Sequence, residues 1–399
     1  MNILFDQTEA QTSYYNGAAE YAQTLFLQLV SLLGDYPDVT LYSLYTSERS
    51  FKYEALSPKS LRSHIRVVPV DYSRKRLKDI IGENNIDLLF VTCAQTFCDL
   101  PLGNLSHLGC KVVAVIHDMY VEEMASSHIE YLHYIKHPGR FLYNCLGRMK
   151  VRLLSGTTTA RAKLMVQLIG DNDSEIVTVS DYSRQAIRYF LPEFADKIHV
   201  FYAPMKTCPD ESTDICNGQL KEIVDNHRKY YLLLSADRIT KNGERMLNAF
   251  KQFAANADPS ALIVTTGCKK SLFSNHVALP FLSSSDINKA YRHCHALLYP
   301  SLFEGFGYPP VEAMSYGKPV LSSNVCSIPE VLGDSPVYFT PIYESSMYGA
   351  LLKFNDMPYD KLAEKATNQY LTIKARQEAD LQNLATKLMN GYFIKLQKQ

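Results

Sequence analysis

The sequence lacks a net charge and lacks the cysteine patterns that mark several common protein classes. Lysine plus arginine and aspartate plus glutamate each number 41, so the formal charge at pH 7 is zero. No field of the whole molecule would draw the chain onto nucleic acid, so charged ligands must be recognised locally. The nine cysteines are scattered singly without a C-x-x-C pair, which argues against a disulfide framework and indicates a reducing compartment.

We also expect neither a membrane-spanning segment nor a leader peptide. The first five residues, Met1 to Phe5, read directly into a short strand and have no basic region, apolar core or cleavage site of a signal peptide. No apolar run approaches the roughly 20 residues that a membrane-spanning helix requires. We therefore expect a cytoplasmic protein, and leave open a peripheral association with the cytoplasmic face of the membrane.

What the chain does have is enough apolar material for two packed α/β domains. Its 399 residues are 46% apolar and 21% charged, which suits two domains of roughly 200 residues each. Short β-rich apolar runs alternate with longer amphipathic stretches, which is typical of β-α-β units and a parallel sheet. The runs are 3–5, 65–70, 88–91, 112–116, 176–179 and 198–201 in the first half and 230–234, 262–264, 296–299, 319–321 and 337–339 in the second.

A polar stretch with two prolines, 203–214, separates the halves and is interpreted as the interdomain linker. We predict an N-terminal domain of residues 1–205 and a C-terminal domain of residues 206–379, each a Rossmann-like, doubly wound parallel sheet. Apolar residues at helical spacing near the end predict that a helix of residues 380–399 packs back on the N-terminal domain. Ligands of such sheets bind beyond the carboxyl ends of the strands, so two facing domains would enclose a central cleft.

The densest chemical signal is the string Tyr299-Pro-Ser-Leu-Phe-Glu304-Gly-Phe-Gly-Tyr-Pro-Pro-Val-Glu312. A strand ends, a loop bends through two glycines, and paired prolines open a helix whose first turn does not need their missing N–H. Gly305 and Gly307 let backbone amides approach an anion closely. The helix N-terminus adds unpaired N–H groups and the positive end of its dipole. The string therefore predicts a phosphate cradle.

Two glutamates, Glu304 and Glu312, frame this cradle. Carboxylates repel phosphate but accept hydrogen bonds from hydroxyl groups. A nucleotide sugar suits both features, because it carries a diphosphate, ribose hydroxyls and sugar hydroxyls in one molecule. A lone glutamate here would be better interpreted as part of an ordinary helix start, where acidic residues are common. The whole string favours a nucleotide-sugar site.

The segment 299–330 resembles the C-terminal signature of the retaining GT-B glycosyltransferases, specifically glycosyltransferase family 4, also called glycosyl transferases group 1. That family is marked by two glutamates with seven residues between them, as Glu304 and Glu312 are. The flanking matches are Pro300-Ser301, Gly305-Phe306-Gly307, Glu312-Ala313-Met314, Gly317, Pro319-Val320 and Ile328-Pro329-Glu330-Val331. The resemblance implies a GT-B architecture, with two Rossmann-like domains facing a central cleft.

Weaker matches follow other predicted strands. They are Asn16-Gly17 in the glycine-bearing loop, His117-Asp118 at the cleft, Val179 to Arg184 at a serine-containing turn, and Arg238 with Lys241 as the basic pair facing the diphosphate. Each has a plainer interpretation, such as a core histidine, a serine helix cap or a solvated basic face. Three departures from the family pattern stand beside them: Ser235-Ala236 replaces the family's glycine, the spacing from Arg238 to Lys241 is shorter than in many members, and Gly17 is followed by two alanines instead of a second glycine.

The resemblance implies a role for each matched residue. The catalytic residues would be Glu304, on donor-sugar hydroxyls and the developing charge, His117, on the sugar, and Lys241 and Arg238, at the diphosphate. The donor-binding residues would be Glu312, on the ribose, with Gly17, Asp118, Gly305, Phe306 and Gly307. It also implies retention of anomeric configuration: the acceptor hydroxyl attacks from the leaving-group side, a donor phosphate oxygen takes its proton, and no protein nucleophile is needed.

We expect no metal and no cofactor beyond the nucleotide-sugar co-substrate. Many transferases use a metal to stabilise the departing nucleoside diphosphate. The D-x-D string Asp171-Asn172-Asp173 lies in a polar stretch before a strand and is interpreted as a solvated turn. No cluster of histidine, cysteine and carboxylate residues has ligand spacing. Arg238, Lys241 and the helix amides would supply the positive charge instead.

The stretch 131–170 indicates a surface for the acceptor. It contains no acidic residue, and its basic residues recur among aromatic and aliphatic ones: Lys136, Arg140, Arg148, Lys150, Arg152, Arg161 and Lys163. Such a stretch can lie on anionic lipid, although two ordinary helices with charges facing water would read the same way. Because it belongs to the acceptor-side domain, we prefer a lipid-linked glycan as acceptor.

The sequence thus predicts a metal-independent retaining glycosyltransferase of surface polysaccharide synthesis, such as that of lipopolysaccharide. It would move a hexose from a nucleotide-diphosphate sugar, with GDP-mannose or UDP-hexose as candidate donors, to a glycan or lipid-linked saccharide. A nucleotide-sugar epimerase and a non-catalytic sugar-nucleotide-binding assembly subunit stay open as alternatives. A dinucleotide oxidoreductase is disfavoured, because no G-x-G-x-x-G follows the first strand.

Overall fold

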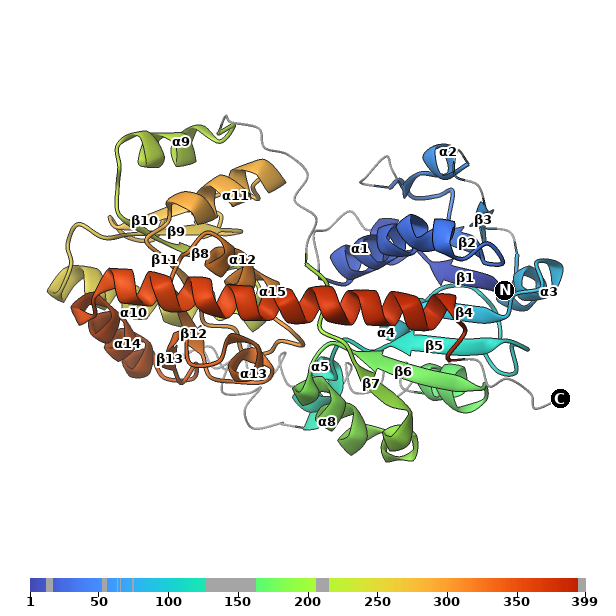
Figure 1. Ribbon diagram of the computed structural model, residues 1–399. Coiled ribbons are helices and arrows are strands. Elements are labelled where there is room, and N and C mark those ends of the chain that lie inside the picture. Colours follow the sequence, from blue (N-terminus) through green and yellow to red (C-terminus); the bar gives the residue numbers. More distant parts are fainter. Residues whose placement is uncertain are drawn as a thin grey trace. The chain divides into compact units, whose positions relative to one another are not determined.

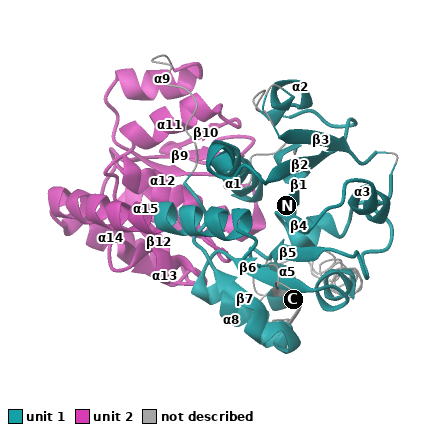
Figure 2. Ribbon diagram, turned by 45° about the vertical axis from the view of Figure 1, so that its right-hand side comes forward, with its two compact units in different colours: residues 1–207, 377–399 teal, residues 208–376 magenta. Residues whose placement is uncertain are grey.

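The sheet of the first unit has seven parallel strands in the order β3-β2-β1-β4-β5-β6-β7 (Figure 1). The computed structural model describes residues 1–11, 17–51, 56–62, 64, 66–73, 75–126, 163–205 and 215–393. The chain forms two units, Met1–Thr207 with Gln377–Gln399, and Cys208–Arg376 (Figure 2). The strands of the first unit are β1 (Asn2–Asp6), β2 (Thr40–Tyr45), β3 (Val67–Asp71), β4 (Leu88–Val91), β5 (Lys111–Val115), β6 (Ser174–Thr178) and β7 (Ile198–Val200).

Helices cover both faces of this sheet. They are α1 (Gly17–Leu32), α2 (Pro58–Leu61), α3 (Leu77–Glu83), α4 (Ala94–Phe97), α5 (Tyr120–Ser126) and α8 (Asp181–Phe190), with short 3-10 turns η1 (Glu9–Gln11), η2 (Leu33–Asp35) and η4 (Pro192–Lys197) and a further helical stretch, 163–170. Successive strand residues point to opposite faces. Phe5 of β1 packs on Phe26 of α1, with 5.2 Å between the ring centroids, whereas Leu4 belongs to the cluster that includes Phe97 of α4 and Ile187 of α8.

The second unit repeats the plan with six parallel strands in the order β10-β9-β8-β11-β12-β13. They are β8 (Tyr230–Leu233), β9 (Leu262–Thr266), β10 (His276–Leu279), β11 (Ala296–Tyr299), β12 (Val320–Ser323) and β13 (Val337–Phe339). The chain runs outward from β8 to β10, returns to place β11 beside β8, and runs outward again to β13. The point between β8 and β11 is therefore the topological switch point, where ligands of doubly wound sheets bind.

The helices of the second unit are α9 (Gly218–Asp225), η5 (Ile239–Lys241), α10 (Gly243–Asn256), α11 (Ser284–His293), α12 (Tyr308–Ser315), α13 (Ile328–Leu332), α14 (Glu344–Asp356) and the start of α15 (Tyr359–Met389). Helices α10 and α14 pack together on one face of the sheet, and α9, α11 and α12 lie on the other (Figure 1). Tyr231 and Leu233 of β8 are buried with Phe250, Phe253 and Phe354 under the first pair. These residues form a hydrophobic core between the sheet and helices α10 and α14.

The predicted fold class, two doubly wound parallel-sheet domains, is confirmed. The sequence reading missed two strands, β2 and β10, and the C-terminal helix begins at Tyr359, well before the predicted stretch, and ends at Met389. The sequence placed its domain limits at 205/206 and 379/380, and the units divide the chain at 207/208 and 376/377. Much of the predicted linker, 206–214, lies outside the described residues.

Candidate functional site

The predicted catalytic residues of the second unit lie at its switch point. Lys241 is the last residue of η5, in the connection from β8 to α10, and Glu304 lies in the loop that follows β11. Because β8 and β11 are hydrogen-bonded neighbours that run in parallel, their carboxyl ends meet at one edge of the sheet. The structure therefore brings together two side chains that are 63 residues apart in the sequence.

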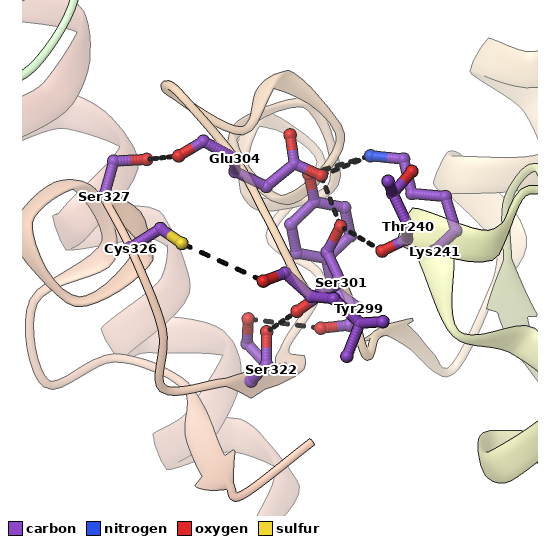
Figure 3. Close-up of polar contacts among 10 residues, drawn as sticks. Thr240, Lys241, Tyr299, Ser301, Glu304, Ser322, Cys326 and Ser327 are labelled. Atoms are coloured by element: carbon purple, nitrogen blue, oxygen red, sulfur yellow. Dashed lines mark hydrogen bonds and ion pairs between the residues drawn. The ribbon is translucent and has the colours of Figure 1, made fainter. Parts of the chain in front are cut away.

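Lys241 and Glu304 form an ion pair between Nζ and Oε1 (Figure 3). The two side chains are only 16% and 15% exposed, so water screens the pair little. Ser301 Oγ also lies against Glu304 Oε1, and it lies 3.2 Å from the carbonyl oxygen of Thr240. Its single proton can be donated to either acceptor. The Glu304 carboxylate is thus held by a cation on one side and a hydroxyl on the other.

The backbone around Glu304 is fixed by hydroxyl groups from the next strand and its loop. Ser323 Oγ, at the end of β12, donates to the carbonyl oxygen of Ser301 (2.6 Å). Ser327 Oγ donates to the carbonyl oxygen of Glu304 (2.8 Å) (Figure 3). The N–H of Leu302 donates to the carbonyl oxygen of Thr240 (2.8 Å). These bonds join the loops after β8, β11 and β12 into one rigid edge.

Asn242 fastens a fourth segment to this edge. Its backbone is left-handed (φ 53°), a conformation that asparagine adopts more readily than most residues. Its side-chain amide donates to the carbonyl oxygens of Pro300 (3.2 Å) and Pro341 (2.7 Å), which follow β11 and β13. The residue next to Lys241 is therefore buried and tied to two other loops, which limits where the lysine can go.

The glycine loop leads into α12 as the sequence predicts. Gly307 caps this helix with φ 95°, a backbone conformation that side chains with a Cβ rarely adopt. Pro309 and Pro310 follow Tyr308 in the first turn of the helix, where a missing N–H costs nothing. Gly305 and Phe306 belong to the same loop, and Phe306 is buried, 5% exposed, with its ring 5.5 Å from that of Tyr308. The helix N-terminus thus faces the same strand end as Glu304.

Glu312, the fifth residue of α12, lies beside a buried tyrosine of α11. Tyr291 is fully buried, and burial, followed by the neighbouring charge of Glu312, raises the pKa of its hydroxyl well above the ordinary value. The hydroxyl therefore stays protonated and neutral near the Glu312 carboxylate. Tyr316 stacks on Tyr291 with 6.3 Å between the ring centroids.

Arg238 lies at the start of η5 with an exposed side chain, and its carbonyl oxygen accepts the N–H of Lys241 (2.9 Å). The departure from the family pattern at Ser235 has a local explanation. Ser235 has φ 51°, so it adopts the left-handed conformation for which glycine is the usual residue. Its N–H donates to Thr266 Oγ1 (2.8 Å) at the end of β9. Ser235 therefore supplies a left-handed residue at this position without a glycine.

The remaining predicted residues belong to the first unit. His117 follows β5, and its Nε2 lies 2.9 Å from the carbonyl oxygen of Thr92. A carbonyl only accepts hydrogen bonds, so Nε2 carries the proton and Nδ1 is left as an acceptor. Burial lowers the pKa of His117 to about 4, so the ring is neutral at pH 7. Ser183 Oγ donates to the carbonyl oxygen of His117 (2.9 Å). Such a ring offers an acceptor to a sugar hydroxyl.

Two further residues of the first unit have structural partners of their own. Asp118 Oδ1 accepts the N–H of Tyr120 at the start of α5 (3.0 Å), and its carbonyl oxygen accepts from Gln95 (2.8 Å). Gly17 is the exposed first residue of α1. Ser180 caps α8 by accepting the N–H of Ser183 (3.1 Å), which is the plainer of its two interpretations. Asn16 and residues 131–162 lie outside the described residues.

The D-x-D string is a turn held by hydrogen bonds and not merely solvated. Asp171 Oδ2 accepts from Ser106 (2.6 Å), Asn172 Oδ1 accepts the N–H of Leu108 (2.7 Å), and Asp173 pairs with Lys111 (2.8 Å). In the part of the chain that the structure describes, no three histidine, cysteine or carboxylate side chains gather as metal ligands would. The same part holds no helix both long and apolar enough to cross a membrane.

Comparison with known proteins identifies the class. Residues 220–341 match the family described as glycosyl transferases group 1. O-antigen chain mannosyltransferase B of Escherichia coli is 35% identical over 114 residues, which is 29% of this chain and 29% of that protein. The chain thus matches less than a third of the length of this curated relative.

Solved structures match the whole fold. Anabaena Alr3699/HepE in complex with UDP-glucose superposes with a TM-score of 0.63 at 16% identity, covering 98% of this chain and 100% of that one. WaaG, a glycosyltransferase involved in lipopolysaccharide biosynthesis, gives a TM-score of 0.61 at 14% identity, with 98% and 100% covered. The protein therefore has the GT-B fold. The resemblance seen in the sequence is confirmed: residues 220–341 match the glycosyl transferases group 1.

Proposed function

We propose that the protein is a retaining glycosyltransferase of surface polysaccharide synthesis, which moves a hexose from a nucleotide-diphosphate sugar to a glycan or lipid-linked saccharide. One observation carries the proposal: Lys241, Glu304 and the N-terminus of α12 are gathered at the switch point of the second sheet. A cation and unpaired helix amides suit a diphosphate. A carboxylate beside them suits the hydroxyls of the attached sugar.

Relatives narrow the substrate class. The curated relative is named a mannosyltransferase of an O-antigen chain, and one structural neighbour was solved with UDP-glucose. These names support a hexose donor and leave GDP-mannose and UDP-hexose as the two candidates. Glu312 would hold the ribose, with Tyr291 steadying its carboxylate. His117 would offer Nδ1 to a sugar hydroxyl.

The chemistry we propose needs no protein nucleophile. The acceptor hydroxyl attacks the anomeric carbon from the side of the leaving diphosphate, the bond from that carbon to the phosphate oxygen breaks, and a phosphate oxygen takes the hydroxyl proton. Lys241 then faces the oxygen on which negative charge develops. NMR of the product tests this route, since the coupling of the anomeric proton must match that of the donor. An inverted product would rule out the retaining mechanism.

The nucleotide is best identified by a thermal-shift screen of UDP, GDP and ADP and their sugars. A ligand at 100 times its Kd stabilises the folded state by about 2.7 kcal/mol, so one nucleotide series should stand out. The selected donor is then incubated with the protein, without and with saccharide acceptors, and its products are separated. We expect a free nucleoside diphosphate and a glycosylated acceptor.

The same incubation separates the alternatives. An isomerised donor sugar without transfer would identify an epimerase. Binding of the nucleotide without hydrolysis or transfer to any acceptor would identify a non-catalytic subunit. Absence of any thermal shift would contradict the proposed nucleotide-sugar site itself.

Metal independence belongs to the proposal and has its own test. Lys241, with Arg238 three residues earlier, supplies positive charge that a divalent ion would otherwise bring to the diphosphate. We expect turnover in EDTA to stay within about twofold of its value with Mg²⁺, because an arranged charge costs no reorganisation during the reaction. Loss of activity in EDTA that Mg²⁺ or Mn²⁺ restores would refute this.

A further inference from the structure

A buried tyrosine lies beside the Lys241 ammonium group, with its hydroxyl end nearest to it. Tyr299 is the last residue of β11 and is 4% exposed. Lys241 Nζ lies 4.9 Å from the centroid of the Tyr299 ring and donates a hydrogen bond to its hydroxyl oxygen (3.3 Å) (Figure 3). A lysine ammonium within about 6 Å of an aromatic face is attracted by the ring quadrupole. Lys241 therefore has two partners of different kinds, this ring and the Glu304 carboxylate.

The two partners account for two of the three N–H groups of Lys241. An ammonium group has three N–H donors. One is directed to Glu304 Oε1 and one to the Tyr299 hydroxyl, and within the described residues no third hydrogen bond of Nζ is found. With two donors fixed, the direction of the third is fixed as well. This third N–H group is the one that can donate a hydrogen bond to a diphosphate oxygen.

Tyr299 is itself held rigidly enough to serve as a support. Its backbone is paired with Ser322 of β12 in the sheet. A Cβ on Gly307 would lie 3.6 Å from the Tyr299 hydroxyl oxygen, so the glycine loop passes over the same ring. Burial, followed by the charge of Glu304, raises the pKa of Tyr299 well above its ordinary value. The hydroxyl hence stays neutral beside both charges.

We infer that Tyr299 is a positioning residue for the diphosphate: it holds the Lys241 ammonium between ring and carboxylate so that its third N–H points toward the bound anion. The inference rests on the proposed function, since it concerns the same donor site. Without the ring and hydroxyl, Lys241 would keep only Glu304 as a partner, and its flexible stem would let the ammonium settle on both carboxylate oxygens. Its positive charge would then be neutralised within the protein instead of facing the diphosphate.

Two variants separate the ring from the hydroxyl. Tyr299→Phe keeps the ring and removes the hydroxyl, and Tyr299→Leu removes both. Tyr230→Phe is the matched control: Tyr230 is 1% exposed, and its hydroxyl donates to the carbonyl oxygen of Ala290 (2.7 Å). It is the first residue of β8 and so lies at the amino edge of the sheet, opposite Tyr299.

The position of Lys241 is read by NMR on protein labelled with ¹³C at the lysine ε carbon. The Lys241 signal is assigned by its loss in Lys241→Arg. Because the ammonium lies 4.9 Å from the ring centroid, the ring current should displace its ε-proton signals from the ordinary lysine position in the wild type and in Tyr299→Phe, and the signals should return to that position in Tyr299→Leu. An ordinary shift in the wild type would overturn the inference without any measurement of activity.

Affinity for inorganic pyrophosphate is then measured by calorimetry. We expect a loss of about tenfold in Tyr299→Leu, the scale of a partly desolvated cation–π contact, and of about threefold in Tyr299→Phe. Tyr230→Phe should bind as the wild type does. Unchanged affinity in Tyr299→Leu, with Lys241→Ala impaired, would overturn the role of Tyr299 alone. Unchanged affinity in Lys241→Ala would instead overturn the diphosphate site of the proposed function.

Discussion

At the scale of single residues, the site depends on a nearly buried ion pair that has further partners. Taking two charges out of water costs several kcal/mol, and their mutual attraction offsets this cost only when extra hydrogen bonds are present. Ser301 supplies one for Glu304, and Tyr299 supplies one for Lys241. The pair is therefore stable without a ligand. Its arrangement before binding is what a preorganised electrostatic site requires.

The first prediction concerns this arrangement. Lys241→Ala and Glu312→Ala should each lower turnover about 10²-fold or more, the scale of one lost preorganised contact in a catalytic site. Lys229→Ala is the control, because Lys229 pairs with Asp258 (2.9 Å) just before β8, away from the switch point. It should leave turnover within about twofold while costing up to about 1 kcal/mol of stability. Steady-state kinetics with the identified donor measure these changes. If either variant turns over as fast as the wild type, that residue is not part of the proposed site.

The second prediction is a pH dependence that comes from His117. Its pKa is lowered from 6.5 to about 4 in the folded state, so between these values the unfolded chain binds a proton that the folded chain does not. Stability due to His117 is thus present above pH 6.5 and is lost as the pH falls toward 4. Lowering the pH from 7.5 to 5 should cost the wild type about 1 to 2 kcal/mol more than His117→Gln.

Urea unfolding of both proteins at the two pH values measures this difference. Asp6, in the same unit, has a pKa raised to about 6 by burial, so its contribution runs in the opposite direction and is lost as the pH rises. Both proteins keep Asp6, so its effect cancels in the comparison. Equal losses in the two proteins would mean that the folded His117 titrates normally.

The residues of the site could be predicted from the sequence only in part. Glu304 and Lys241 stand out because each follows a strand and has the charge that a nucleotide sugar needs. Tyr299 and Asn242 do not, since a tyrosine at a strand end or an asparagine at a helix start is common. Their roles depend on β8 lying beside β11. The spacing of apolar residues does not reveal the order of the strands in the sheet.

At the scale of elements, the connection from β8 to α10 is the most tightly built. Gly243 opens α10 directly against Ala236, three residues past the end of β8. A Cβ on Gly243 would lie 2.3 Å from the Ala236 carbonyl oxygen and 2.8 Å from its Cβ. Both neighbours are close to the backbone and cannot move away cheaply. The loop that carries Arg238 and Lys241 is therefore clamped at its two ends.

The third prediction follows from this clamp. Gly243→Ala should destabilise the protein by about 2 kcal/mol or more through steric strain, and should weaken nucleotide binding because the Lys241 loop must shift. Gly349→Ala is the control, since Gly349 is exposed within α14 and has nothing within 4 Å of a new Cβ. That change should stabilise by about 0.5 to 1 kcal/mol. Thermal unfolding with and without nucleotide measures both effects, and a neutral Gly243→Ala would show that the loop can yield.

Element positions were predictable where the apolar run was continuous. Strand β4 matches its predicted run, Leu88–Val91, and all four of its residues are buried. Strand β2 was missed because its burial alternates along Thr40–Tyr45 and polar residues interrupt the run. Strand β10 was missed because it opens with His276, which the sequence does not mark as buried; its ring bonds to Thr265 on the neighbouring strand (2.8 Å). Strands that contain buried, hydrogen-bonded polar residues are missed when strands are predicted from apolar runs.

At the scale of the whole molecule, charge is balanced and recognition depends on local groups. The 41 basic and 41 acidic residues cancel, so approach of a charged surface is governed by where the charges lie. In the second unit, Arg238 and Lys241 lie in the connection from β8 to α10, where we propose that a diphosphate binds. In the first half of the sequence, the stretch 131–170 has only basic charges, set among aromatic residues. We propose that it binds an anionic membrane surface on which a lipid-linked acceptor is presented.

The last prediction tests that surface. Each basic residue near an anionic membrane contributes roughly 1 kcal/mol, and the attraction falls off within a Debye length. The protein should therefore sediment with vesicles containing 30% phosphatidylserine at about 20 mM salt, release at about 500 mM salt, and ignore neutral vesicles. A variant with Lys136, Arg140 and Arg148 changed to Gln should bind at least about tenfold more weakly. The control changes Lys221, Lys251 and Lys353 of the other unit to Gln; equal weakening there would show a general charge effect, and no binding at low salt would remove the membrane surface altogether.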